Sequence, residues 1–270
     1  MTPDLLHFEA RPLPRTPKVW LFDMDDTLYC ASAGMFDAIH YEMRHWIAKA
    51  LSIPVPEAQA KQEAYWAQYG ATFIGLARHE GIDAEAFLNA VHHFDVEALA
   101  RTRVPAAYLR RVLVRLPGKK FLLTNGPRDY AHRVLRHLAV EDVFSGEMTS
   151  SDMHVLGRWR CKPDKTLLVR AAAMAGVKPR DCVLVEDSLR NLRAAKSLGM
   201  LTVWCTGNAG RGRAVQKPVW VDSVISTAKD LPRLCLHKPV AEAHFPVIDG
   251  RYHSLFRNSL RFPESLVNYP

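Results

Sequence analysis

Three carboxylates, Asp23, Asp25 and Asp26, stand within four positions directly after the apolar run 19–22. Four consecutive apolar residues predict a short strand that is buried on both faces. The acids would then lie at the tip of a sheet, where open α/β folds bind their ligands. Two carboxylates in one small volume repel each other unless a divalent cation, a shared proton or a nearby Lys or Arg offsets them. The alternative is an acidic turn in solvent, and a calcium loop fits poorly because Thr27 replaces its glycine.

Two later apolar runs also end in polar residues, and a lysine stands between them in the chain. These residues are Thr124-Asn125, Lys162 before a proline, and Glu186-Asp187. Each has an ordinary explanation alone: a turn, a solvated lysine, and the N-cap region of a helix. Because the carboxyl ends of parallel strands share one edge of a sheet, their order favours a common site.

Such an edge has the groups that phosphoryl transfer needs. A carboxylate pair with a hard cation such as Mg²⁺ can receive oxyanions. A lysine and a threonine hydroxyl can hold the remaining phosphoryl oxygens. One aspartate can attack phosphorus while the other protonates the leaving oxygen.

The elements that position these residues alternate between strand and helix, which predicts a parallel sheet covered on both faces, an α/β fold. The expected strands are 18–23, 119–126, 143–149, 182–187, 200–204 and 220–221. The expected helices are 35–51, 57–69, 71–80, 84–93, 106–116, 128–138, 163–175 and 189–198, the seventh starting at Pro163.

No strand pattern appears between residues 34 and 100, so this all-helical block is a candidate cap inserted after the first strand. The predicted organisation has four parts. They are a Pro-rich lead-in (1–17), an α/β core (18–29 and 101–235), a helical cap (30–100) and a C-terminal extension (236–270) with no clear period.

The composition limits the class of protein further. The chain has 270 residues, 48% of them hydrophobic, and no apolar run approaches the ~18 residues of a membrane span. Five separated cysteines without a C-x-x-C pair, and a Pro-rich start unlike a signal peptide, predict reduced thiols in a cytoplasmic protein. The formal charge of +8 suits an anionic small molecule; nucleic acid is not expected, because no dense basic run has interleaved aromatics.

Four short motifs resemble those of haloacid dehalogenase-superfamily phosphatases, over about residues 18–235. They are Phe22–Leu28 (FDMDDTL), Leu123–Gly126 (LTNG), Lys162-Pro163, and Val185–Ser188 (VEDS). The resemblance implies a Rossmann-like core, Mg²⁺ and an aspartyl-phosphate intermediate.

Residue roles are carried over from the resemblance position by position. Asp23 would be the nucleophile and a Mg²⁺ ligand, and Asp25 the general acid/base, with its carbonyl on Mg²⁺. Thr124 and Asn125 would bind the phosphoryl group, Lys162 would neutralise its charge, Asp187 would bind Mg²⁺, and Glu186 would ligate directly or through water.

A shorter resemblance concerns the cap. The segment 69–76 (YGATFIGL), Val91-His92 and Tyr29 are similar to the pyrimidine 5′-nucleotidase branch. It implies a pyrimidine nucleoside 5′-monophosphate as substrate, with Thr72 and His92 as contacts and Tyr69, Phe73 and Arg78 as further candidates. The alternatives are a phosphatase or phosphomutase of sugar phosphates or other small metabolites, a metal-free haloalkanoate dehalogenase, and a catalytically silent binding module.

Overall fold

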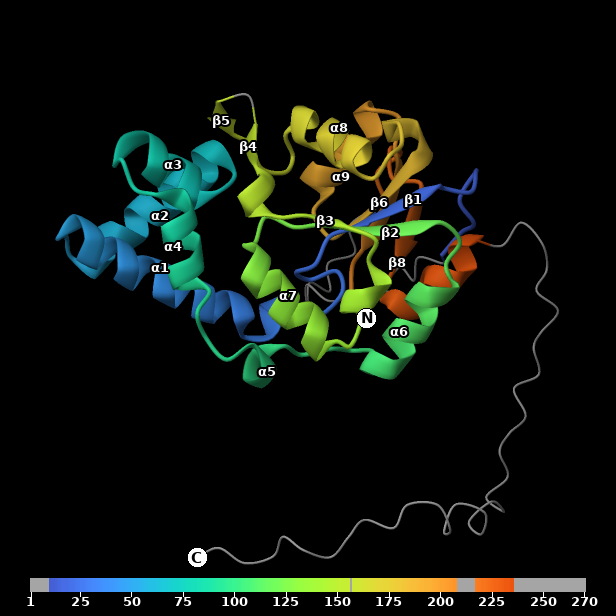
Figure 1. Cartoon of the computed structure of the whole chain (residues 1–270), viewed down its shortest axis with the longest axis horizontal. Coiled ribbons are helices and arrows are strands. Elements are labelled where there is room, and N and C mark those ends of the chain that lie inside the picture. Colours follow the sequence, from blue (N-terminus) through green and yellow to red (C-terminus); the bar gives the residue numbers. More distant parts are fainter. Residues whose placement is uncertain (1–9, 156, 208–216, 236–270) are drawn as a thin grey trace, which may run out of the picture. The chain divides into compact units, whose positions relative to one another are not determined.

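The computed structural model describes residues 10–155, 157–207 and 217–235, which are built around one parallel sheet (Figure 1). Its order is β3 (Glu147–Met148), β2 (Lys119–Leu123), β1 (Val19–Phe22), β6 (Cys182–Glu186), β7 (Leu201–Cys205) and β8 (Ser223–Ile225). Phe22 at the end of β1 pairs with Leu122 and with Val185. The carboxyl ends of the three central strands therefore lie side by side, and the predicted α/β fold is confirmed.

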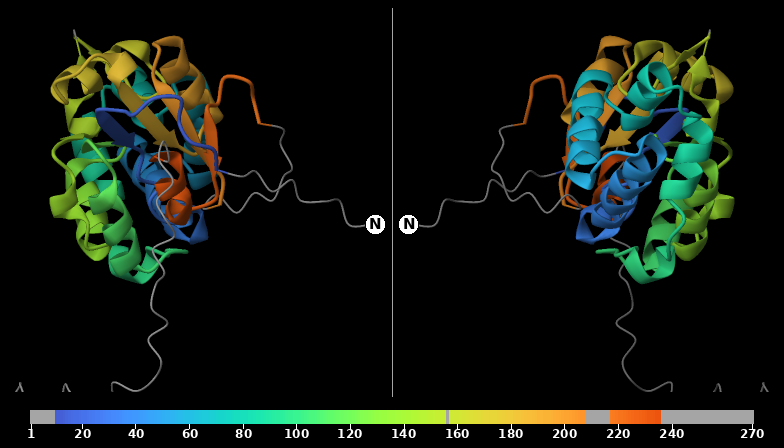
Figure 2. Two further views of the ribbon diagram at one scale, coloured as in Figure 1. Left: turned by 90° about the vertical axis from the view of Figure 1, so that its right-hand side faces the viewer. Right: turned by 90° about the vertical axis from the view of Figure 1, so that its left-hand side faces the viewer.

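Strand β1 is buried on both faces, as its uninterrupted apolar run predicts. Trp20 and Phe22 join the core cluster that contains α6 (Ala106–Arg115), α7 (Arg128–His137) and the 3₁₀ segment η5 (Ala228–Cys235). Val19 and Leu21 join the cluster of α8 (Lys165–Met174) and α9 (Leu189–Ser197). The left-hand view of Figure 2 shows the strands between these two layers of helices.

All the helices predicted between residues 34 and 100 form, and that interval contains no strand. They are α1 (Met35–Leu51), α2 (Val55–Tyr69), α3 (Thr72–His79) and α4 (Ala84–Val91), followed by a short unpredicted α5 (Val96–Leu99). Helices α1 to α4 pack on one another, and the right-hand view of Figure 2 shows them in front of the sheet. Gly75 lets α2 and α3 approach, since a Cβ there would lie 2.2 Å from Cγ of Tyr65.

Four details differ from the sequence predictions. The strand expected at 143–149 is reduced to β3, and the one expected at 220–221 is β8, a few residues later. The helix expected to start at Pro163 starts at Lys165, because the Asp164 side chain caps it by accepting from the Leu167 amide at 3.1 Å. A hairpin of two-residue strands, β4 (His154–Val155) and β5 (Arg158–Trp159), is too short to show a period.

The described residues include no helix that is long and apolar enough to cross a bilayer. The C-terminal extension, 236–270, and most of the Pro-rich lead-in, 1–9, lie outside the described residues. The predictions made for these segments, and the cytoplasmic location, therefore stay predictions.

Candidate active site

The turn after β1 directs its three acids to different places. The amide of Asp23 still donates to the carbonyl of Val185 at 3.0 Å, so Asp23 continues the strand into the sheet edge. Asp26 has a left-handed backbone (φ 56°), and its carboxylate accepts from the Ser32 amide at 2.8 Å. Thr27 donates to Oδ2 of Asp23 at 3.0 Å. Asp26 is thus used within the turn, while Asp23 and Asp25 remain as candidates for chemistry.

Lys162 connects the ends of three strands. Its Nζ lies 2.5 Å from Oδ1 of Asp23 and 2.9 Å from Oε2 of Glu186, and all three side chains are buried. Its backbone amide donates to Oδ1 of Asn125 at 3.1 Å. Thr124, at the end of β2, is also buried, and its hydroxyl accepts from the Gly126 amide at 3.0 Å. The structure therefore brings together the residues predicted to hold a phosphoryl group.

Burial sets the charges of this cluster. Burial and the Glu186 carboxylate raise the pKa of Asp23 to about 7, against the opposing effect of Lys162. Burial and Glu186 also raise the pKa of Asp187 to about 9. Burial alone would lower the pKa of Lys162, but the two carboxylates beside it raise that pKa overall. Three acids share one ammonium group, so in the absence of a cation the pKa values of Asp23 and Asp187 rise and the cluster retains protons. A bound cation would favour the ionised carboxylates.

The donor set fits a hard divalent cation. Carboxylate oxygens of Asp23, Glu186 and Asp187 lie within 4.8 Å of one another. Oxygen ligands of this kind suit Mg²⁺. The indole Nε1 of Trp204 donates to the carbonyl of Asp187 at 2.9 Å, which fixes the backbone at this corner. The part proposed for the Asp25 carbonyl stays a prediction.

Asp25 is held by two tyrosines. Its Oδ1 accepts from the hydroxyl of Tyr29 at 2.5 Å and from that of Tyr130 at 2.8 Å, and both rings are buried. No hydrogen bond to Oδ2 exists among the residues that the structure describes. Burial raises the pKa of Asp25, and the two tyrosine hydroxyls oppose that shift. One carboxyl oxygen is thus fixed while the other is available for proton transfer.

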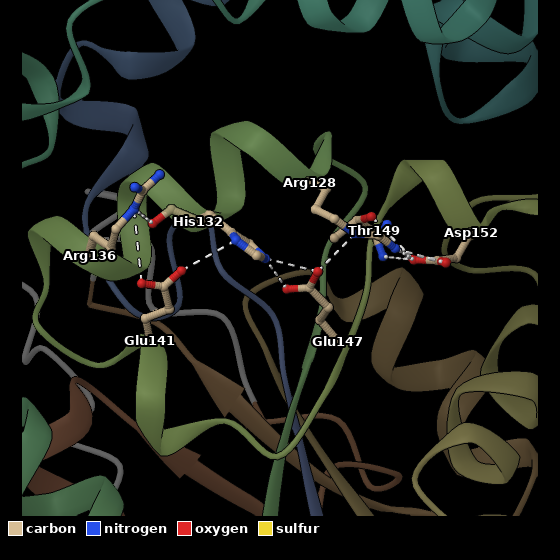
Figure 3. Close-up of polar contacts among 7 residues, drawn as sticks. All are labelled: Arg128, His132, Arg136, Glu141, Glu147, Thr149 and Asp152. Atoms are coloured by element: carbon tan, nitrogen blue, oxygen red, sulfur yellow. Dashed lines mark hydrogen bonds and ion pairs between the residues drawn. The ribbon is translucent and has the colours of Figure 1, made fainter.

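Tyr130 could not be identified from the sequence, where it is one apolar position on helix α7. That helix is attached to the sheet by a chain of polar contacts (Figure 3). Arg128 contacts Glu147 of β3 at 2.9 Å and Asp152 at 2.9 Å, and Nε2 of His132 lies 2.8 Å from Glu147. These contacts fix the face of α7 that presents Tyr130 to Asp25.

A cavity of about 540 Å³ opens beside Asp25, and we call it the substrate cavity. Asp25, Asn125 and Gly126 contribute one wall, and helices α1 to α4 contribute the rest. The helical part is lined by Phe36, Ile39, His40, Met43, Arg44, Gln59, Gln62, Glu63, Trp66, Gly70, Ala71, Thr72, Phe73, Leu88 and His92. The helical insert therefore surrounds the space in which a leaving group would lie.

Only some of the cap residues that were predicted to contact the substrate line the substrate cavity. Thr72 and His92 do line the substrate cavity, although the Thr72 hydroxyl donates to the Gln62 carbonyl at 3.2 Å. Burial lowers the pKa of His92 to about 4, and its Nδ1 lies 2.7 Å from the Leu88 carbonyl. Tyr69 and Arg78 line a different hollow. The cavity residues of α1 and α2 were not predicted, because their spacing is that of any amphipathic helix.

The sequence of residues 17–199 matches the protein-family model of the haloacid dehalogenase-like hydrolases. The chain therefore belongs to this family, and the resemblance of its four motifs is confirmed.

Individual relatives are more distant. Phosphate metabolism protein 8 of Saccharomyces cerevisiae is 28% identical over 72% of this chain and 65% of its own length. The chain thus matches less than two thirds of that yeast protein. Glyceraldehyde 3-phosphate phosphatase of Methanopyrus kandleri is 28% identical over 69% of this chain and 82% of its own length. The structure of CbbY from Rhodobacter sphaeroides in complex with phosphate has a TM-score of 0.58 at 19% identity, covering 82% of this chain and all of that one. This structural likeness supports the fold alone.

Proposed function

We propose that this chain is a Mg²⁺-dependent phosphatase that hydrolyses a small phosphomonoester through an aspartyl phosphate on Asp23. The observation that carries the proposal is the placement of Asp23 and Lys162 at the sheet edge, with Oδ1 of Asp23 2.5 Å from Nζ of Lys162. Asp25, two residues after Asp23, lines the adjacent substrate cavity. Asp23, Glu186 and Asp187 would hold the metal, which would offset negative charge on the carboxylates and on the substrate. The names of the relatives agree, since one of them is a phosphatase.

The residues divide the reaction between them. An oxygen of Asp23 attacks phosphorus and the ester P–O bond breaks, while Asp25 gives its proton to the leaving alkoxide. Lys162 and Thr124 bind the phosphoryl oxygens during this transfer. Asp25 then takes a proton from water, which attacks phosphorus, and the bond to Asp23 breaks to release phosphate. Tyr29 and Tyr130 keep Asp25 in place by holding one of its oxygens.

We further propose that residues 30–100 act as a cap on a core of residues 18–29 and 101–235. The sheet edge contacts only the phosphoryl group, so a choice among monoesters has to come from the leaving-group side. On that side the substrate cavity is lined mainly by the helical insert.

For the leaving group we propose a pyrimidine nucleoside, and Gln62 is the residue suited to read its base. Gln62 is only 8% exposed, and among the described residues its Nε2 has a hydrogen bond to the Met43 sulfur alone, at 3.7 Å, a weak acceptor. An amide presents a donor beside an acceptor, so it can match the edge of either uracil or cytosine. Phe36 and Trp66 add aromatic surface in the same cavity.

The test compares kcat/KM for UMP and CMP with AMP, GMP and a hexose phosphate. Gln62→Leu should lower kcat/KM for UMP by about 10–100-fold, because a buried polar edge of the base is left unpaired. Its activity on p-nitrophenyl phosphate should stay normal. Gln68→Leu is the matched control on the same helix, at an exposed position that does not line the substrate cavity.

The outcomes separate the claims. A preference for purines or for the hexose phosphate would overturn the pyrimidine assignment but leave the phosphatase intact. Sugar phosphates are the alternative, because a relative is named for glyceraldehyde 3-phosphate. Transfer of phosphate within a sugar phosphate, without release, would indicate a phosphomutase. Failure to hydrolyse any aryl phosphate with Mg²⁺ present would remove the phosphatase proposal itself.

A further inference from the structure

A second hollow lies on the side of the α2–α3 junction that faces the β4–β5 hairpin and α9. It measures about 270 Å³, and none of the residues assigned above to catalysis lines it. Three arginines from three different elements line it: Arg78 of α3, Arg160 just after β5, and Arg190 in the first turn of α9. We call it the arginine hollow.

The charges in this hollow are not balanced. Asp164 is its only carboxylate, and it lies 2.7 Å from one terminal nitrogen of Arg160. Three arginines and one aspartate leave an excess of two positive charges. Burial raises the pKa of the neighbouring Cys161 thiol to about 11, so it adds no negative charge at neutral pH. Over the part of the chain that the structure describes, Arg78 and Arg190 have no ion pair with a carboxylate.

Two of the arginines have donors that the described part of the protein leaves unused. The Nε of Arg160 is the one buried side-chain nitrogen or oxygen, among the residues described, that has no hydrogen-bond partner. Buried donors in native proteins are almost always satisfied, so Arg160 keeps hydrogen-bonding capacity that the described residues do not use. The guanidinium of Arg78 lies 5.1 Å from the centre of the Tyr69 ring, which positions it without using its N–H groups.

We propose that the arginine hollow binds a small phosphorylated polyanion, separately from the catalytic site. Guanidinium groups match phosphate oxygens with paired, charge-assisted hydrogen bonds. The ligand would connect α3 of the helical insert with Arg160 and Arg190. The inference does not depend on the proposed phosphatase activity, because it concerns binding to different residues.

Inorganic pyrophosphate is the probe, titrated calorimetrically into the full chain in metal-free buffer at constant ionic strength. Trp159 lines the hollow, so the fluorescence difference between wild type and Trp159→Phe reports binding at this place. Saturable binding with a change in Trp159 emission is expected. Arg190→Ala should weaken it by about tenfold or more, as loss of one charge-assisted contact predicts.

Two control variants make the result decisive. Arg193→Ala removes the same charge from the same helix at an exposed position outside the hollow, and it should change Kd less than twofold. Asp23→Asn should bind pyrophosphate normally, whether or not the chain is a phosphatase. The inference is overturned if pyrophosphate does not bind, if Arg193→Ala weakens binding as much as Arg190→Ala, or if Asp23→Asn abolishes it.

Discussion

The carboxyl edge of the sheet and the helical insert meet at the substrate cavity, but they are built differently. At the sheet edge, charged groups are buried and fixed by short contacts, such as those of Lys162 with Asp23 and Glu186. In the insert, the cavity is lined by helix faces whose apolar residues also pack α1 to α4 together. Substitutions at the edge should therefore affect every substrate, whereas substitutions in the insert should change the choice of substrate.

The largest loss among the variants that sharpen this comparison is expected for Asp25→Asn. Turnover of a nucleotide should fall by about 10²–10⁴-fold, because the leaving alkoxide loses its proton donor. The loss should be smaller with p-nitrophenyl phosphate, whose leaving group needs little protonation. Steady-state rates on both substrates check this, with thermal unfolding as the control for folding. Equal losses on the two substrates would contradict the acid role in the first step.

Asp187→Asn tests the proposed metal site at the same sheet edge. The Mg²⁺ concentration for half-maximal activity should rise by at least ~10-fold, since one of three clustered carboxylates is lost. A magnesium titration of the initial rate measures this shift. Wild-type activity that survives exhaustive chelation would remove the metal from the account and favour dehalogenase-like chemistry.

The insert should respond to pH through His92. Its folded pKa, about 4, lies below the ordinary histidine value, so the unfolded chain binds this proton first as pH falls. The contribution of neutral His92 to the free energy of unfolding is therefore complete above about pH 6.5. It is lost as the pH falls toward 4, and the loss reaches about 3 kcal/mol. Urea unfolding at several pH values should show a smaller pH dependence for His92→Gln than for wild type. Identical slopes for the two proteins would contradict the buried neutral histidine.

The smallest effect is expected at the polar chain of Figure 3, on the outer face of α7. The Arg128 side chain is 48% exposed, so its ion pairs with Glu147 and Asp152 are weakened by solvent. Arg128→Ala should cost no more than about 1 kcal/mol of unfolding free energy. A loss of several kcal/mol in denaturant unfolding would mean that this network matters as much as a buried one.

The same comparison explains what the sequence could predict. A residue at the end of a buried strand, or directly after it, has its place set by the sheet, so Asp23, Thr124 and Glu186 could be assigned to one edge. Tyr130 and Gln62 lie on helices, where a buried aromatic or amide side chain is compatible with many roles. The residues that they face are distant in the chain, so the sequence could not assign them to the site. Arg78 and Tyr69 were expected beside the substrate, but the turn at Gly70 places them in the arginine hollow.

The central claim is that Asp23 carries the phosphoryl group, and the most direct measurement is to trap it. Asp25→Asn should slow hydrolysis of the intermediate, so this variant is mixed with p-nitrophenyl phosphate and Mg²⁺, quenched in acid and digested. Mass spectrometry should find one phosphoryl group on the peptide that contains Asp23, and none in the double variant Asp23→Asn/Asp25→Asn. Phosphate release from the Asp25→Asn protein with no label on that peptide, or an active Asp23→Asn single variant, would contradict the account.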